Sequence, residues 1–160
     1  MKIRNATIDD FDEIVQLEHA CFPINEAASE NDLKERLTHY PNHFWLLYED
    51  DVLVSLIDGL CTDINDLNDD MFSDAGMHDE DGDVQMILSV CTHPDYQKKG
   101  YSTTLMKQVI SDCKKQNRQS IVLTCKSFLL DFYSKFGFVD EGISKSQHGG
   151  ENWNQVRLTL

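Results

Sequence analysis

Positions 84–105 read VQMILSVCTHPDYQKKGYSTTL, and the character of the chain changes twice along them. The run from Val84 to Thr92 is apolar and rich in β-branched residues, and it has the length of a buried strand. Pro94 ends this run, because proline lacks the N–H that a sheet ladder needs. After Gly100 the apolar side chains return at helical spacing. The stretch therefore predicts a strand, a tight polar loop and a helix in direct succession.

The loop between this strand and this helix predicts an anion-binding site. Backbone N–H groups of a glycine loop and the positive end of a helix dipole converge at such a place. Lys98 and Lys99 add two positive charges beside Gly100. A phosphate group is the ligand that this combination favours.

The same loop resembles the acyl-CoA-binding motif of the GNAT superfamily of N-acetyltransferases, which reads Q/R-x-x-G-x-G/A. The matching residues are Gln97, Gly100 and Ser102, and the segment THPDYQ before them is also of the family type. Ser102 is a departure, because the motif has glycine or alanine there. The resemblance implies an α/β GNAT fold. That fold has a mixed central sheet of about six to seven strands, helices on both faces and a splayed central strand pair.

The resemblance also implies acetyl-CoA as the cosubstrate and acyl donor. The pyrophosphate would lie on the glycine loop, and the pantetheine arm would bind free backbone groups of the central strand. The implied CoA-binding residues are Val90, Cys91, Thr92, Gln97, Lys98, Lys99, Gly100, Tyr101, Ser102, Thr103, Phe132 and Lys135. No metal is expected, because the five cysteines have neither metal-ligand spacing nor a disulfide pattern.

A second resemblance lies toward the C-terminus, where positions 123–138 read LTCKSFLLDFYSKFGF. This segment looks like the GNAT segment that ends in FYxxFGF. Together with EHACFP at 18–23 and VLVSLIDGLCTD at 52–63, it is most similar to the arylalkylamine (serotonin-type) N-acetyltransferase group. By the family pattern Tyr133 is the catalytic residue that protonates the departing thiolate. A phenol has a reference pKa near about 10 and so carries its proton at neutral pH.

The general base of that group has no counterpart in this sequence. Two histidines on the central strand serve it there, and the corresponding positions here are Met86 and Leu88. A primary ammonium with a pKa near ~10.4 needs roughly 4.6 kcal/mol to supply its neutral form at pH 7. The candidates for the base are Glu26, Asp63, His78 and Asp83. Glu26, which lies between the first two expected helices, is the predicted amine contact.

Composition narrows the class of partner. A length of 160 residues predicts a single domain over 1–160. The net charge of −14 argues against nucleic acid and an anionic membrane as partners, and it favours a cationic small molecule. No signal peptide or membrane-spanning run is expected, and a reducing cytoplasm is the expected compartment. A homodimer remains open.

Periodicity and turn signals predict the remaining elements. Strands are expected over 3–6, 43–48, 52–60, 84–92, 120–125, 138–143 and 153–160. Helices are expected from a Thr7–Asp10 capping box to about 21, from Ser29 to just before Pro41, over 101–116 and over 127–136. The segment 62–83 contains nine acidic residues and is expected to be a long exposed loop with a short helix around Met71.

The predicted function is that of an acetyl-CoA-dependent N-acetyltransferase. It would acetylate the primary amine of a small cationic molecule by direct attack in a ternary complex. One alternative is a protein N-terminal or lysine acetyltransferase. Another is a catalytically idle acyl-CoA-binding regulatory module, which the missing histidines favour and which Tyr133 and the glycine loop oppose.

Overall fold

Nine strands form two sheets in the computed structural model, which describes residues 1–160. The first sheet has the spatial order β1 (Lys2–Asn5), β2 (Phe44–Glu49), β3 (Val52–Asp58) and β6 (Ser89–Thr92), and it is antiparallel throughout. The second sheet has the order β4 (Cys61–Thr62), β5 (Val84–Ile87), β7 (Ser120–Cys125), β9 (Asn154–Thr159) and β8 (Val139–Ile143). Its β5–β7 pair is parallel, so the sheet is mixed.

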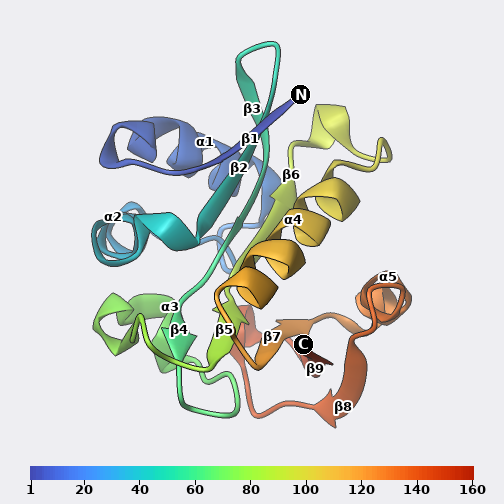
Figure 1. The fold of residues 1–160 in the computed structure, drawn as a ribbon. Coiled ribbons are helices and arrows are strands. Elements are labelled where there is room, and N and C mark those ends of the chain that lie inside the picture. The colour runs from blue at the N-terminus through green and yellow to red at the C-terminus, as the bar shows by residue number, and fades with distance from the viewer.

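Five α-helices accompany the sheets. They are α1 (Phe11–Cys21), α2 (Glu30–His39), α3 (Asp70–Ser73), α4 (Tyr101–Lys115) and α5 (Leu130–Ser134). The helices α1 and α2 pack into one apolar core and α4 into another, on opposite faces of the strands (Figure 1). The predicted mixed α/β fold with helices on both faces is therefore confirmed. None of the helices combines the length and the apolar character that a membrane crossing requires.

The central run from Val84 to Thr92 forms two strands, so the prediction of one strand is wrong. β5 pairs with β4 and β7 of the second sheet, whereas β6 pairs with β3 of the first. Leu88, at the change, donates its N–H to the Asp58 carbonyl at 2.7 Å. A Cβ on Gly59 would stand 1.7 Å from the Met86 carbonyl oxygen, so only glycine fits this crossing. Because β6 turns away, β7 has no strand partner on its β5 side beyond Leu123, which gives the predicted splay.

The predicted helix starts are confirmed by their caps. The Thr7 N–H donates to the Asp10 carboxylate at 2.8 Å, in a capping box that precedes α1. The Ser29 hydroxyl accepts from the Asp32 N–H at 3.1 Å at the start of α2. Before α4, Gly100 has a φ of +84°, which a residue without Cβ adopts at little cost.

The acidic segment 62–83 is more structured than expected. It begins at β4 and contains α3, which confirms the short helix expected there. Leu67 and Met71 are buried in the core that α1 and α2 share. These two apolar side chains fix the middle of the segment, while most of its carboxylates remain exposed to water.

The C-terminal elements are shorter than the sequence predicts. A 3₁₀ turn at Ser127–Leu129 leads into α5, so the regular α-helix occupies only part of 127–136. Gly137 has a φ of +100° and ends the helix, as expected for a C-terminal glycine. The antiparallel pair β8–β9 then completes the second sheet.

Candidate active site

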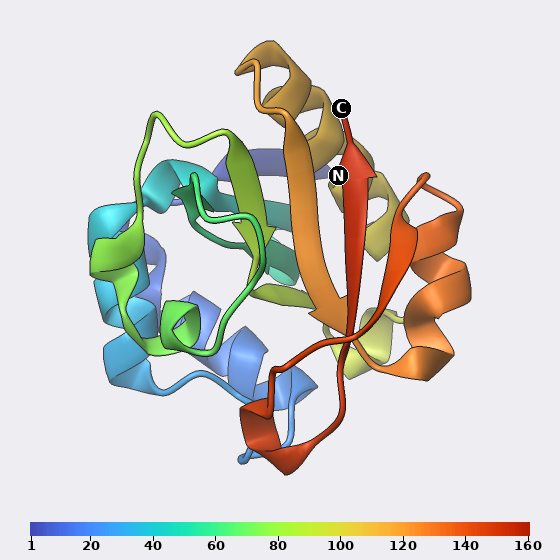
Figure 2. The ribbon, with the colours of Figure 1, turned by 90° about the horizontal axis from the view of Figure 1, so that it is seen from below.

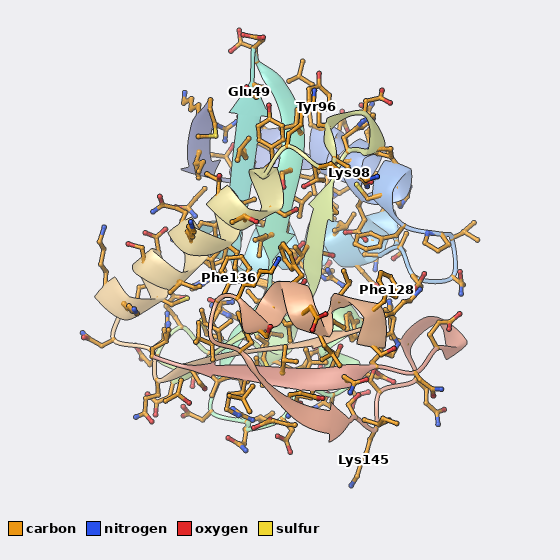
Figure 3. The ribbon with its side chains drawn as sticks, turned by 90° about the vertical axis from the view of Figure 1, so that its right-hand side faces the viewer. Glu49, Tyr96, Lys98, Phe128, Phe136 and Lys145 are labelled. Carbon is orange, nitrogen blue, oxygen red and sulfur yellow. The ribbon has the colours of Figure 1, made fainter.

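An open groove of about 640 Å³ lies where β6 runs through the glycine loop into α4. Ten of the twelve predicted CoA-binding residues line it: Val90, Cys91, Thr92, Gln97, Lys98, Gly100, Tyr101, Ser102, Thr103 and Phe132. Lys99 and Lys135 do not line it. Figure 3 shows Tyr96 and Lys98 on the side of the loop and Phe128 and Phe136 on the side of α5.

The loop end of this groove has polar groups of the kind that suit an anion. The N–H groups of the first turn of α4 have no helical acceptor of their own. The Gln97 amide donates to the Thr92 carbonyl at 3.3 Å, and the hydroxyls of Thr92 and Ser102 are 2.6 Å apart. These contacts hold the loop against the end of β6.

A second, smaller cavity of about 90 Å³ lies in the splay between β5–β6 and β7. Its lining is mainly apolar and includes two acidic side chains and one histidine: Glu18, Phe22, Glu26, Phe72, Ile87, Leu88, Ser89, Val90, Leu123, Thr124, Cys125, Leu129, Tyr133, His148 and Trp153. Four residues border both cavities, namely Phe22, Val90, Leu129 and Tyr133. The groove and the small cavity therefore meet beside Tyr133.

Tyr133 is held at this meeting point by aromatic packing. Its ring lies edge-on to Phe132 and Phe138, with centroids 5.0 and 5.7 Å away. Burial raises the pKa of the Tyr133 phenol above its ordinary value, so the hydroxyl keeps its proton at neutral pH. The geometry thus offers a protonated donor where a molecule in the groove would reach the small cavity.

Of the four base candidates, only Glu26 lines either of these two cavities. Its carboxylate is buried and pairs with the Lys126 ammonium at 2.8 Å. Asp63, His78 and Asp83 line neither cavity. The Asp63 carboxylate instead accepts the Asp83 N–H at 3.0 Å, which joins the two ends of the acidic segment.

Two polar residues of the small cavity, Glu18 and His148, were missed by the sequence prediction. Glu18 is only 1% exposed and accepts hydrogen bonds from the Ser89 hydroxyl at 2.7 Å and the Ala28 N–H at 3.2 Å. The available signal was a carboxylate on the apolar side of α1. His148 lies in the β8–β9 loop, 130 positions after Glu18, and no local pattern marked it.

Two loops cover the small cavity. The Asn25 amide of the α1–α2 connector donates to the Gly149 carbonyl of the β8–β9 loop at 2.8 Å. His148 Nε2 donates to the Glu26 carbonyl at 2.7 Å, and Asp69 accepts the Gln147 N–H at 3.0 Å. Figure 2 shows the two loops meeting at the lower edge of the molecule. The cavity is therefore closed on this side by direct contacts.

A separate group of ligand-type side chains lies away from both cavities. The ligand atoms of His43, His78 and Glu80 lie within 4.8 Å of one another. However, the Cys61 N–H donates to His78 Nδ1 at 3.0 Å, so the proton of a neutral ring is on Nε2, which donates to Glu80. A metal ion bound to His78 Nε2 would require the neutral ring to lose that proton and become an anion. These side chains are better described as a hydrogen-bonded cluster. The hydrogen bonds from the two histidines outweigh the effect of burial and lower the pKa of Glu80.

Sheets that part beside a glycine loop, with a groove that meets a smaller cavity in the splay, are typical of an acyl-CoA-binding fold of the acetyltransferase type. The family model described as the acetyltransferase (GNAT) domain matches residues 2–139. The chain belongs to the GNAT acetyltransferase family. No curated protein sequence matches it.

Solved structures agree with this fold. The loading GNATL domain of CurA from Lyngbya majuscula is 18% identical, with a TM-score of 0.86 over 99% of this chain and 96% of that one. The GphF GNAT-like decarboxylase with isobutyryl-CoA is 18% identical, with a TM-score of 0.85 over 99% of both chains. The ribosomal-protein-S18-alanine N-acetyltransferase from Escherichia coli is 14% identical, with a TM-score of 0.74 over 99% and 93%. At these identities the likeness concerns the fold, and the arylalkylamine subgroup stays a prediction.

Proposed function

We propose that the chain transfers the acetyl group of acetyl-CoA to the primary amine of a small cationic molecule, by direct attack in a ternary complex. The observation that carries this proposal is the meeting of two cavities beside Tyr133. A groove with an anion-binding loop suits CoA, and a chamber with carboxylates suits a small cation. The thioester would lie between them.

Three parts of the site support this chemistry. The pyrophosphate would bind the N–H groups from Lys98 to Thr103 at the start of α4. The edge of β6 that faces away from β3 has no strand partner, so its backbone groups at Val90 and Thr92 are available to the pantetheine arm. Tyr133 would donate its proton to the sulfur as the C–S bond breaks.

The cover over one side of the small cavity favours a small acceptor over a protein. A peptide would have to pass between the α1–α2 connector and the β8–β9 loop, which touch at Asn25–Gly149 and at Glu26–His148. The chamber volume of about 90 Å³ also suits a compact molecule. The net charge of −14 and the five free cysteines fit a cationic acceptor and a reducing cytoplasm.

A thiol-release assay with acetyl-CoA tests the proposal. The acceptors are small alkylamines, a peptide with a free N-terminus and a lysine peptide with a blocked N-terminus. We expect CoA release that depends on the alkylamines and an N-acetylated product of matching amount. Acetylation of a peptide alone would support the protein acetyltransferase instead. CoA binding without turnover on any amine would support a binding module.

A further inference from the structure

We infer that Glu18 and His148 form the acceptor site of the small cavity, an inference that rests on the proposed acetyl transfer. Glu18 binds the ammonium group of the acceptor, and His148 Nδ1 removes its proton. The two residues come from α1 and from the β8–β9 loop, and both line the same chamber. They take the place of the base that the missing strand histidines leave vacant.

Glu18 has the environment of a carboxylate that awaits a cation. Its side chain is buried, and its two oxygens accept from neutral groups, the Ser89 hydroxyl and the Ala28 N–H. No lysine, arginine or histidine forms a salt bridge with it, whereas Glu26 across the cavity is already paired with Lys126. A buried charge without a counter-ion is costly. An acceptor ammonium in the chamber would supply that counter-ion.

His148 is fixed in the tautomer that a general base needs. Its Nε2 is 2.7 Å from the Glu26 carbonyl oxygen, which only accepts, so Nε2 must carry a proton. In the neutral ring Nδ1 then holds the lone pair. The ring is kept in place by stacking on Phe72, with centroids 4.3 Å apart and planes at 13°, and by the Trp153 indole, which donates to the His148 carbonyl.

The choice of His148 as base follows from the strengths of the two groups. An alkylammonium has a reference pKa of about 10.4, against about 6.5 for imidazole and about 4.3 for a carboxylic acid. Proton transfer to imidazole is thus uphill by about four pKa units, and transfer to a carboxylate by about six. The charged groups around His148 are Glu18, Asp69 and the Glu26–Lys126 pair. Of these, Glu18 lies in the chamber without a salt-bridge partner and is suited to stabilise the imidazolium.

The proton and electron balance closes with these groups. The ammonium gives one proton to Nδ1 of His148, and the amine lone pair forms the C–N bond to the thioester carbonyl carbon. The C–S bond then breaks with its electron pair on sulfur, which takes the proton of Tyr133. The tyrosinate then takes one proton from the attacking nitrogen, which leaves the neutral amide. The products are the acetamide, CoA thiol and one proton, which His148 releases to water.

Two amines of similar size test the pair: isobutylamine, whose ammonium is strongly basic, and 2,2,2-trifluoroethylamine, which is largely neutral at pH 7.5. We expect His148→Gln to lower kcat/KM for isobutylamine by ~10²–10⁴. Glutamine keeps a donor for the Glu26 carbonyl but has no basic nitrogen. We expect Glu18→Gln to lower the same constant about 10- to 100-fold, mainly through KM. Neither variant should lower kcat/KM for trifluoroethylamine more than about threefold.

The ratio of the two kcat/KM values decides the outcome, because it does not depend on the fraction of folded protein. His39→Gln and Glu13→Gln, on exposed parts of α2 and α1, are the matched controls and should leave the ratio unchanged. Equal losses for both amines in His148→Gln or Glu18→Gln would overturn the inference and leave the proposed function intact. If the wild-type chain acetylated neither amine, the proposed function would fail, and the acceptor pair would fail with it.

Discussion

Replacing Gly100 with alanine tests the position of the phosphate site. Gly100 has a φ of +84° and lines the groove, and a Cβ added there would meet no protein atom within 4 Å. Gly142 on β8 offers a matched control, since its φ is +92° and its Cβ would also meet nothing within 4 Å. Gly142 does not line the groove. The two substitutions therefore share the backbone strain and differ only in their relation to the groove.

The expected magnitudes separate strain from binding. Holding an alanine in the left-handed region costs roughly 1–2 kcal/mol. For a chain of this size each kcal/mol lowers Tm by about 2–4 °C, so both variants should melt about 2–8 °C below wild type. In Gly100→Ala the methyl group would also keep the phosphates from the loop N–H groups. Losing one hydrogen bond to a charged group costs about 1.5–3 kcal/mol, which corresponds to about 10- to 150-fold in affinity.

Calorimetric titration with CoA, together with thermal melts of both variants, measures the two effects. We expect Gly142→Ala to bind CoA as wild type does and Gly100→Ala to bind at least about tenfold more weakly. Equal CoA affinity in the two variants, with equal losses in Tm, would show that the phosphates do not approach Gly100.

Three further predictions follow from other parts of the molecule. Tyr133→Phe should lower kcat with acetyl-CoA by ~10², the lower end of the range for general acid catalysis. The CoA affinity measured by calorimetry should stay unchanged. A kcat equal to that of wild type would remove Tyr133 from the mechanism. Burial, only partly offset by the Arg36 guanidinium 3.2 Å away, raises the pKa of Asp58 to about 7 from 3.8. The folded state therefore binds the proton more tightly than the unfolded state, and stability should fall as pH rises from about 4 to 7. Asp58→Asn should flatten this slope in thermal melts over that range, and an unchanged slope would argue against the assignment. The acidic segment 62–83 should help to attract a cationic amine. Because the Debye length is about 8 Å at physiological ionic strength, kcat/KM should fall as salt is added. An equal kcat/KM at low and high salt would exclude this electrostatic steering.

The parts of the fold that depend on local chemistry could be predicted from the sequence. A capping box at Thr7, an N-cap at Ser29 and a glycine at position 100 each act within a few residues, and the structure has all three. Nine of the groove residues that the family resemblance implied lie in this one strand–loop–helix unit, whereas Lys99 of the unit does not line the groove and Phe132 comes from α5.

The split of the central run at Leu88 could not be predicted, because both halves are equally apolar. The split depends on which distant strands pair with each half. β6 pairs with β3, whereas β5 pairs with β4 and β7. The small cavity depends in the same way on tertiary contacts. His148 lines the cavity with Glu18 because the β8–β9 loop bonds to the α1–α2 connector, and neither loop shows this in its own sequence.

A crystal structure with a non-hydrolysable acetyl-CoA analogue is the most direct test of the site. We expect the pyrophosphate on the N–H groups of the loop from Lys98 to Thr103 and the acyl group beside Val90, opening toward Glu18. The atom that replaces sulfur should lie within hydrogen-bonding distance of the Tyr133 hydroxyl. A pantetheine arm that leaves the groove before Tyr133, or an acyl group outside the splay between β6 and β7, would contradict the account.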